Sequence, residues 1–405
     1  MRTILEKYQN YNKSERRSFE SRLELALYLS YLQARKGGKR HTHDEHSFEV
    51  NLFNNLELLK QDILNKTYNP SRSSAHIIFK PVIREIFAAP FRDRIVHHLI
   101  FESVYDWWDH HFIYDSYSCR INKGVLFGIK RLDHHIRSVS GNYKRPAFVL
   151  KLDIQGYFMS LPRRELYDRA IWGLNRQFKT RQNSREYEIL KFLWQHTIMD
   201  DPVVGAKKKG DLAAWDKLPK SKSLFCQPKG RGIVIGNLTS QLLSNIYLDQ
   251  LDRFITIDLG YQHYGRYVDD FYIVVSEEEL PQLKKDIKAI KEYLSLLKLT
   301  LHPKKQLLKN SKYGIPFLGV TVYNDHIIPG QRLVNNAKKA MSEVVSGHHT
   351  ADSVPSYLGH LKHYNSYKIV KKIFEQNGWD YVDDDLFRMP SQKSLPLKDA
   401  GKAQT

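Results

Sequence analysis

The chain has 405 residues, of which 41% are hydrophobic and 12% aromatic, so it is long enough for two or three subdomains around a full core. Its 63 lysines and arginines exceed its 44 aspartates and glutamates, and the formal net charge of +19 points to a polyanionic partner, nucleic acid before an anionic membrane. Two cysteines exclude a disulfide framework and a cysteine-based zinc site, and no apolar run reaches membrane-spanning length, so we expect a cytoplasmic protein that binds no membrane.

The predicted elements mix helices and strands without strict βαβ alternation, which indicates an α+β fold. Apolar residues at three- and four-residue steps predict helices at 14–36, 47–67, 93–111 and 124–139, several between 156 and 196, and others at 236–255, 277–297, 332–346 and 354–375. Short β-branched runs predict strands at 75–79, 81–87, 146–154, 262–267, 270–275 and 314–323. The Lys- and Gly-rich stretch at 205–231 is expected to be an exposed loop.

Three histidines, His41, His43 and His46, lie beside Asp44 and Glu45 in a basic stretch between the first two predicted helices. Their spacing offers no convincing helical face and no cysteine partner for a metal ion. We therefore favour a loop that contacts phosphate, or is simply solvated, over a metal site.

The tetrapeptide Tyr-Val-Asp-Asp occurs twice, at 267–270 and at 381–384. The first copy lies between two predicted strands, so a tight turn there projects Asp269 and Asp270 from a fixed backbone. The second copy has no strand after it and is predicted to be a solvated acidic turn. The first copy is therefore the candidate for chemistry.

Adjacent carboxylates on a rigid turn suit phosphoryl transfer that is assisted by two divalent metal ions. Magnesium fits this role because it prefers oxygen ligands. Such a site needs a further carboxylate from elsewhere in the chain, and Asp153, at the end of the predicted strand FVLKLD, is the candidate. An Asp pair alone fits a helix cap or a structural ion pair equally well, so the ordered set of motifs decides the interpretation.

The ordered motifs FVLKLDIQGYF, IGNLTSQ, YVDD, LTLHPKK and FLGV, between residues 148 and 320, resemble the palm of a reverse transcriptase. REIFAAPFRDRIVHHLI at 84–100 resembles the fingers motif that precedes the palm in bacterial reverse transcriptases, and SYSCRINKG at 116–124 resembles the stretch that follows that motif. The resemblance covers roughly residues 76–325 and implies a right-hand polymerase fold of the α+β class, with an antiparallel palm sheet. The implied domains are a helical extension of the fingers at 1–75, fingers and palm at 76–325, a small helical thumb at 326–390 and a polar tail at 391–405.

The resemblance also implies roles for individual residues, with two Mg²⁺ ions as cofactors and Mn²⁺ as a possible substitute. The catalytic metal ligands would be Asp153, Asp269 and Asp270, with the Ile154 carbonyl as an added oxygen ligand. The residues around the incoming nucleotide would be Arg84, Lys80, Phe158, Ile235, Gly236 and Lys305. The primer grip would be Phe317, Leu318 and Gly319.

Several of these roles have simpler alternatives. Phe158, at the position that would reject ribonucleotides, could be an ordinary core aromatic. Arg84 and Lys80, which would contact the triphosphate, could form surface salt bridges. Lys305, which would protonate the pyrophosphate leaving group, could be a plain surface lysine.

Ile235 and Gln241 depart from the common pattern, since most reverse transcriptases have Gln and Pro at these two positions. An isoleucine keeps the bulk of the glutamine but removes its donor and acceptor, so checking of the incoming base should loosen. This pattern resembles the reverse transcriptases of diversity-generating retroelements, which copy a template RNA with frequent errors opposite adenine in mutagenic retrohoming.

The resemblance implies template RNA, the RNA/cDNA duplex, deoxynucleotides and a small basic oligomeric accessory protein as partners, in a bacterial or phage-encoded setting. One alternative is another bacterial reverse transcriptase, of the group II intron, retron or phage-defence type. The other is a non-catalytic RNA-binding scaffold with this fold.

Overall fold

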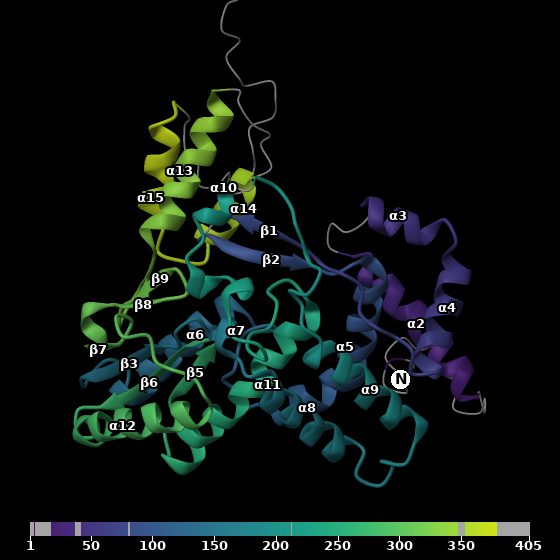
Figure 1. Cartoon of the computed structure of the whole chain (residues 1–405). Helices are drawn as coiled ribbons and strands as arrows, with labels where there is room; N and C mark the ends of the chain where they lie inside the picture. Colours follow the sequence, from purple (N-terminus) through teal and green to yellow (C-terminus); the bar gives the residue numbers. More distant parts are fainter. Residues whose placement is uncertain are drawn as a thin grey trace, which may run out of the picture. The chain divides into compact units, whose positions relative to one another are not determined.

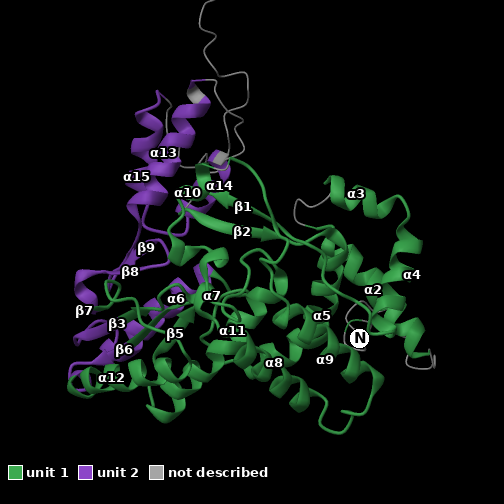
Figure 2. Ribbon diagram, viewed as in Figure 1, with its two compact units in different colours: residues 1–124, 151–273, 281–307 green, residues 125–150, 274–280, 308–405 purple. Residues whose placement is uncertain are grey.

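The computed structural model of the protein describes residue 4 and residues 18–36, 42–79, 82–211, 213–346 and 353–378 (Figure 1). The chain divides into two compact units (Figure 2). Unit 1 comprises residues 1–124, 151–273 and 281–307, and unit 2 comprises residues 125–150, 274–280 and 308–405. Within the described ranges, no helix has the length and apolarity needed to cross a membrane.

Most of unit 1 is helical. Its helices are α2 (Phe19–Ala34), α3 (His43–Glu49), α4 (Leu52–Leu64), α5 (Phe91–His111), α7 (Tyr157–Ser160), α8 (Arg163–Gln177), α9 (Arg185–Met199), α10 (Ala213–Asp216), α11 (Leu238–Arg253) and nearly all of α12 (Leu280–Leu296). The side chains of Ser18, Thr42 and Ser184 accept hydrogen bonds from backbone N–H groups at the starts of α2, α3 and α9. These caps satisfy donors that the first helical turn leaves unpaired, which explains where the three helices begin.

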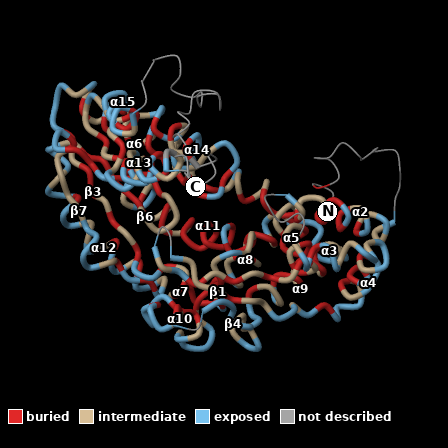
Figure 3. The backbone as a smooth tube through the Cα atoms, turned by 90° about the horizontal axis from the view of Figure 1, so that it is seen from above, coloured by how far each residue is buried: buried red, intermediate tan, exposed pale blue. Residues whose placement is uncertain are grey.

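The helix α11 is the most completely buried long helix of unit 1 and is drawn mostly in red in Figure 3. Its buried residues include apolar side chains and also Asn245, Asp249 and Asp252. Buried polar groups must find partners within the protein, because water cannot reach them. The polar side chains of α11 therefore fix its position against neighbouring segments.

Two sheets contribute strands to unit 1. In the first, β1 (Ser74–Ile78) pairs antiparallel with β2 (Arg84–Ala88) and parallel with β4 (Lys207–Lys208). The second has the order β5-β6-β3-β7 and contains β5 (Tyr264–Tyr267), β6 (Asp270–Ser276), β3 (Ala147–Asp153) and β7 (Leu307–Asn310). Tyr267 pairs with Asp270 across β5 and β6, so only two residues form the turn between these strands.

Unit 2 contains a small antiparallel sheet and a helical cluster. The sheet has the order β10-β9-β8 and consists of β8 (Ile315–Phe317), β9 (Val320–Val322) and β10 (Ile327–Pro329). The helices are α6 (Val125–Ser140), α13 (Gln331–Val345), α14 (Ser353–Leu361) and α15 (Tyr367–Glu375). Met341, Leu361 and Val370 are among the buried residues that join α13, α14 and α15 into one core.

The prediction of an exposed loop at 205–231 was wrong in part. This stretch contains β4, α10 and the short helices η1 (Lys220–Lys222) and η2 (Leu224–Cys226). Leu224 is buried in a cluster with Phe87, and Trp215 and Phe225 pack against that cluster. Elements of two to four residues are too short to show a hydrophobic period, so the lysines between them dominated the sequence pattern.

The single helix predicted at 354–375 is two helices, α14 and α15. Asn365 interrupts them because its backbone N–H donates to the Ile327 carbonyl at 2.8 Å and its side-chain oxygen accepts the Ile327 N–H at 3.0 Å. Pairing with β10 therefore replaces the helical hydrogen bonds at this point. The second Tyr-Val-Asp-Asp copy, at 381–384, and the tail at 391–405 lie outside the described residues.

The basic stretch with the histidines is partly helical. His43 and His46 lie in α3, and His41 is outside the described residues. The neighbouring acids have structural partners, since Asp44 accepts the Phe91 N–H at 2.6 Å and Glu45 accepts from Arg35 at 3.1 Å.

Candidate active site

The three predicted carboxylates come together in unit 1 at the ends of two strands. Asp153 is the last residue of β3, Asp270 is the first residue of β6, and Asp269 lies in the turn before it. The Ile154 N–H donates to the Asp269 carbonyl at 3.1 Å, which joins the two acidic segments through their backbones. The Ile154 side chain is buried.

The segment LTLHPKK lies along the other side of Asp153. Ile154 pairs with Leu301 in an isolated bridge, and the His302 N–H donates to the Asp153 carbonyl at 2.8 Å. This pairing carries the chain to Lys305, whose ammonium lies 2.9 Å from the Asp153 carboxylate. The structure thus brings Lys305, whose side chain is 57% exposed, next to Asp153, and its role as a proton donor stays a prediction.

A second lysine, Lys151, forms an ion pair with Asp270. Lys151 and Asp153 are two residues apart in β3, so their side chains lie on the same face of the strand. The Lys151 ammonium is 3.0 Å from Oδ2 of Asp270. The other carboxylate oxygen of Asp270, Oδ1, is buried and has no hydrogen-bond partner among the described residues.

Burial sets the electrostatics of the turn. It raises the pKa of Asp269 to about 6, and the charge of Asp153 contributes to that rise. Burial likewise raises the pKa of Asp270 to about 6, although Lys151 opposes the shift. Both shifts mean that the ionised carboxylates lack sufficient compensating positive charge in this arrangement.

The donor set fits a hard divalent cation. Carboxylate oxygens are the ligands that Mg²⁺ prefers, and Mg²⁺ usually takes only one or two of them, with water and substrate phosphates completing its shell. In the part of the chain that the structure describes, no three acidic, His or Cys side chains converge closely enough to enclose an ion. Two of the three carboxylates instead pair with lysines, and the unpartnered Oδ1 of Asp270 is the atom best placed to become a ligand.

The residues predicted to contact the incoming nucleotide lie on several elements of unit 1. Arg84 is the exposed first residue of β2, and Lys80 lies outside the described residues. Phe158 lies in α7, five residues after Asp153, and is half-buried. The Ile233 N–H donates to the Phe158 carbonyl at 2.9 Å, so the segment that leads to Ile235 is attached to α7.

Ile235 and Gly236 join this segment to β2. The Phe87 N–H donates to the Ile235 carbonyl at 2.9 Å, and the Ile235 side chain packs against the cluster that contains Phe87. Gly236 has φ 132° and no room for a side chain. Gln241 is exposed in the first turns of α11, where its carbonyl accepts from Ser244 at 2.8 Å.

The predicted primer-grip residues form a turn in unit 2. Phe317 ends β8, and Leu318 and Gly319 lead into β9 with φ 48° and 87°. The Gly330 N–H donates to the Gly319 carbonyl at 2.9 Å, which ties this turn to the start of α13.

Comparison with known proteins now gives the family. The profile of the family described as "Reverse transcriptase (RNA-dependent DNA polymerase)" matches residues 83–322, more than half of the chain. The chain belongs to the reverse transcriptase family. The description of this family names an RNA-dependent DNA polymerase.

Solved structures of telomerase share similarity with this reverse transcriptase. The telomerase of Candida albicans, in complex with a TWJ fragment of telomeric RNA, is 11% identical, with a TM-score of 0.48, over 77% of this chain and 56% of the telomerase chain. The apo telomerase of Candida tropicalis is 10% identical, with a TM-score of 0.46, over 78% of this chain and 59% of its own. The reverse transcriptase thus spans somewhat more than half the length of these telomerases. No curated protein matches its sequence.

Two charged residues of the reverse transcriptase site were missed by the sequence analysis. Lys151 was passed over as part of the strand that ends in Asp153, although the two-residue alternation of a strand places both on one face. Arg266 lies three residues before Asp269 and is fully buried. A charge inside an otherwise apolar strand was a signal that a buried partner must exist.

Replacing Asp269 by asparagine is expected to stabilise the metal-free protein at pH 7.5. The folded protein holds a proton on Asp269 up to about pH 6, whereas an unfolded aspartate releases it near pH 4, so the stability of the fold falls as pH rises through that window. The neutral amide of Asp269→Asn does not titrate, so the variant avoids this loss of stability. Chemical denaturation in EDTA should show a free energy of unfolding about 1–3 kcal/mol above that of the wild type at pH 7.5, and little difference between the two proteins near pH 4.

The exposed Asp216 provides the control for this measurement. Asp216→Asn should show no comparable gain at pH 7.5. A less stable Asp269→Asn protein at pH 7.5 would contradict the electrostatic account of the turn.

Proposed function

We propose that this reverse transcriptase makes error-prone, adenine-mutagenised cDNA from a template RNA, as the enzyme of a diversity-generating retroelement. Ile235 carries the proposal, together with Gln241. The two residues stand where most reverse transcriptases have Gln and Pro, and the sequence pattern resembles that of the mutagenic enzymes.

The contacts of Ile235 support a direct effect of its side chain on base selection. Its carbonyl is held by the Phe87 N–H, and Gly236 follows in close contact with the Phe87 carbonyl. The backbone is thus fixed on β2, so a change at this position alters mainly the side chain. An isoleucine offers no hydrogen bond to a nascent base pair. The difference in binding free energy between a correct and a mismatched pair is then smaller, so the enzyme discriminates less between them.

The proposed chemistry uses two Mg²⁺ ions, with Mn²⁺ as a substitute, held by Asp153, Asp269, Asp270 and the Ile154 carbonyl. When bound, the ions would activate the attacking hydroxyl and steady the leaving pyrophosphate. Lys305 is proposed as the proton donor to the pyrophosphate, because its ammonium already lies beside Asp153.

The proposed partners are template RNA, the RNA/cDNA duplex, deoxynucleotides and a small basic oligomeric accessory protein, in a bacterial cytoplasm. Exposed lysines in β4 and between β4 and α11 support contact with a phosphate backbone. They are Lys207, Lys208, Lys209, Lys217, Lys220, Lys222 and Lys229.

The test compares cDNA made by the wild type, by Ile235→Gln and by the control Ile235→Leu on one RNA template. Ile235→Gln restores a donor and an acceptor and should lower misincorporation opposite adenine about fivefold, the factor that one net hydrogen bond of about 1 kcal/mol supplies. Ile235→Leu keeps an apolar side chain of the same size and should leave the error spectrum near that of the wild type. Equal error rates opposite adenine in all three proteins would refute the role of Ile235.

A further inference from the structure

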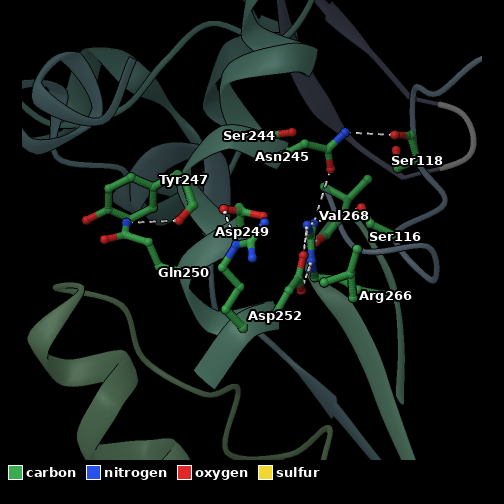
Figure 4. Close-up of polar contacts among 12 residues, drawn as sticks. Ser116, Ser118, Ser244, Asn245, Tyr247, Asp249, Gln250, Asp252, Arg266 and Val268 are labelled. Atoms are coloured by element: carbon green, nitrogen blue, oxygen red, sulfur yellow. Dashed lines mark hydrogen bonds and ion pairs between the residues drawn. The ribbon is translucent and has the colours of Figure 1, made fainter. Parts of the chain in front are cut away.

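A fully buried arginine lies directly behind the catalytic turn. Arg266, in β5, forms a two-pronged ion pair with Asp252 of α11, with both nitrogen–oxygen distances at 2.6 Å. Both side chains have no exposed surface. Figure 4 shows Arg266 between Asp252 and Asn245, with Val268 beside it.

The Arg266 guanidinium donates to further acceptors on three segments. Besides Asp252, the acceptors are Oδ1 of Asn245 at 3.2 Å, Oγ of Ser116 at 3.3 Å and the Val268 carbonyl at 2.9 Å. A guanidinium has five N–H donors in a rigid plane, so these bonds leave it a single orientation. The Val268 carbonyl is the one acceptor among these that belongs to the catalytic turn.

The acceptors on α11 are themselves held. Asp252 also accepts from the Tyr264 hydroxyl at 2.6 Å, and Asn245 donates to the Ser118 carbonyl at 2.8 Å. The backbone of Arg266 is fixed as well, because its N–H donates to the Asp115 carbonyl at 2.9 Å. Both ends of Arg266 are therefore fixed independently of the turn, the guanidinium by α11 and the backbone by the Asp115 carbonyl.

The turn needs such a hold because of its backbone conformation. Val268 has φ 56°, in the left-handed region that a β-branched residue avoids. Two-residue turns between antiparallel strands favour glycine where φ is positive. Without an external hold on its carbonyl, Val268 would relax toward negative φ and rotate the peptide that leads into Asp269.

We propose that Arg266 is a positioning residue of the polymerase site, which holds the Val268 carbonyl so that Asp269 and Asp270 face the metal ions. Asp252 and Asn245 orient the guanidinium for this task. The inference rests on the polymerase activity of the family and is independent of the error-prone character proposed above.

Arg266→Lys tests the role of the guanidinium. Lysine keeps the charge opposite Asp252 but presents a single ammonium, which cannot reach Asp252, Asn245 and the Val268 carbonyl together. We expect primer extension at saturating nucleotide to fall at least about tenfold, and the Mg²⁺ concentration for half-maximal rate to rise several-fold, because the carboxylates are displaced. Binding of Mn²⁺ by the protein, followed by electron paramagnetic resonance without nucleotide, should weaken in parallel.

The rescue variant separates positioning from general packing. Glycine adopts φ 56° without steric cost, so Val268→Gly in the Arg266→Lys background should restore Mn²⁺ binding and part of the rate. Loss of packing around a buried arginine would not be repaired by removing the Val268 side chain. An Arg266→Lys protein that Val268→Gly leaves unimproved would overturn the proposal.

Arg163 supplies the matched control. It is a buried arginine of unit 1 whose guanidinium donates to the Asp200 carbonyl at 2.9 Å and lies 3.3 Å from Asp201. Arg163→Lys should lower the melting temperature without weakening Mn²⁺ binding. Equal weakening by Arg163→Lys and Arg266→Lys would also contradict the proposal.

A second variant covers the case in which Arg266→Lys does not fold. Asn245→Ala keeps both partners of the Arg266–Asp252 ion pair and removes one acceptor of the guanidinium together with the donor to the Ser118 carbonyl, so it should weaken Mn²⁺ binding by a smaller factor in the same direction. Unchanged Mn²⁺ binding in Asn245→Ala would count against the proposal. If the wild type itself fails to extend primers, the assignment of activity fails, whereas an active wild type with insensitive variants refutes only the role of Arg266.

Discussion

Replacing Asp270 by asparagine is expected to abolish primer extension while RNA binding persists. Asparagine keeps the shape of the side chain but removes the negative charge that lies 3.0 Å from the Lys151 ammonium. Metal-ion stabilisation of charge in phosphoryl transfer is worth several kcal/mol, so we expect a rate loss of at least about a thousandfold. The measurement is extension of a labelled primer on an RNA template with Mg²⁺ and deoxynucleotides.

RNA binding should be retained because one carboxylate is a small part of a chain with a formal charge of +19. Asp168, whose side chain is 56% exposed beside Arg164, provides the control. Asp168→Asn should extend primers at the wild-type rate. Full extension by Asp270→Asn would show that the turn is not the catalytic centre.

Replacing Gly236 by alanine is expected to reduce extension at least about tenfold by moving the start of α11 away from β2. A Cβ at this position would lie 2.2 Å from the Phe87 carbonyl oxygen, at φ 132°. The Phe87 N–H donates to the Ile235 carbonyl at 2.9 Å. Neither β2 nor the segment that contains Ile235 and Gly236 can therefore move away from the clash without breaking this hydrogen bond. The free energy of unfolding should fall by about 1–3 kcal/mol, measured by chemical denaturation.

Gly230 is a control position that distinguishes the effect of the steric clash from that of the strained backbone conformation. It has φ 81°, and a Cβ there would meet no atom within 4 Å. Gly230→Ala should therefore show the conformational cost without the displacement, and its extension rate should stay close to that of the wild type. Equal losses of rate in Gly230→Ala and Gly236→Ala would contradict the steric explanation.

The hairpin of β5 and β6, with its two aspartates, could be predicted from sequence because its signals are local. Two β-branched runs flank the turn, and Asp153 ends a strand of the same kind, so local patterns and motif order together assign the three carboxylates. The neighbouring lysines have different origins. Lys305 was suggested by the resemblance, whereas the pairing of Lys151 with Asp270 joins residues far apart in the chain and depends on β3 lying beside β6.

Arg266 shows where sequence reasoning ends. Its burial predicts a partner of opposite charge, but the sequence offers several aspartates nearby, and Asp258, Asp269 and Asp270 are all closer along the chain than Asp252. The choice of Asp252 follows from the orientation of α11 against β5, which local patterns do not encode. The contact with the Val268 carbonyl depends in turn on the positive φ of that residue.

The stretch at 205–231 shows how composition misleads over short elements. Its exposed lysines were predicted correctly, yet Leu224 is buried and Phe225 stacks on Phe87 with ring centroids 5.7 Å apart. These two apolar residues dock the segment onto β2 through a tertiary contact. An element as short as η2 carries no periodic signal, so only the structure reveals the docking.

Sequencing of the cDNA that the wild type makes on an RNA template with all four bases tests the central claim most directly. We expect DNA products of template length, with substitutions concentrated opposite template adenines. DNA products with substitutions spread evenly over the four template bases would contradict the proposed mutagenic function, and the absence of any DNA product would contradict the assignment of the site itself.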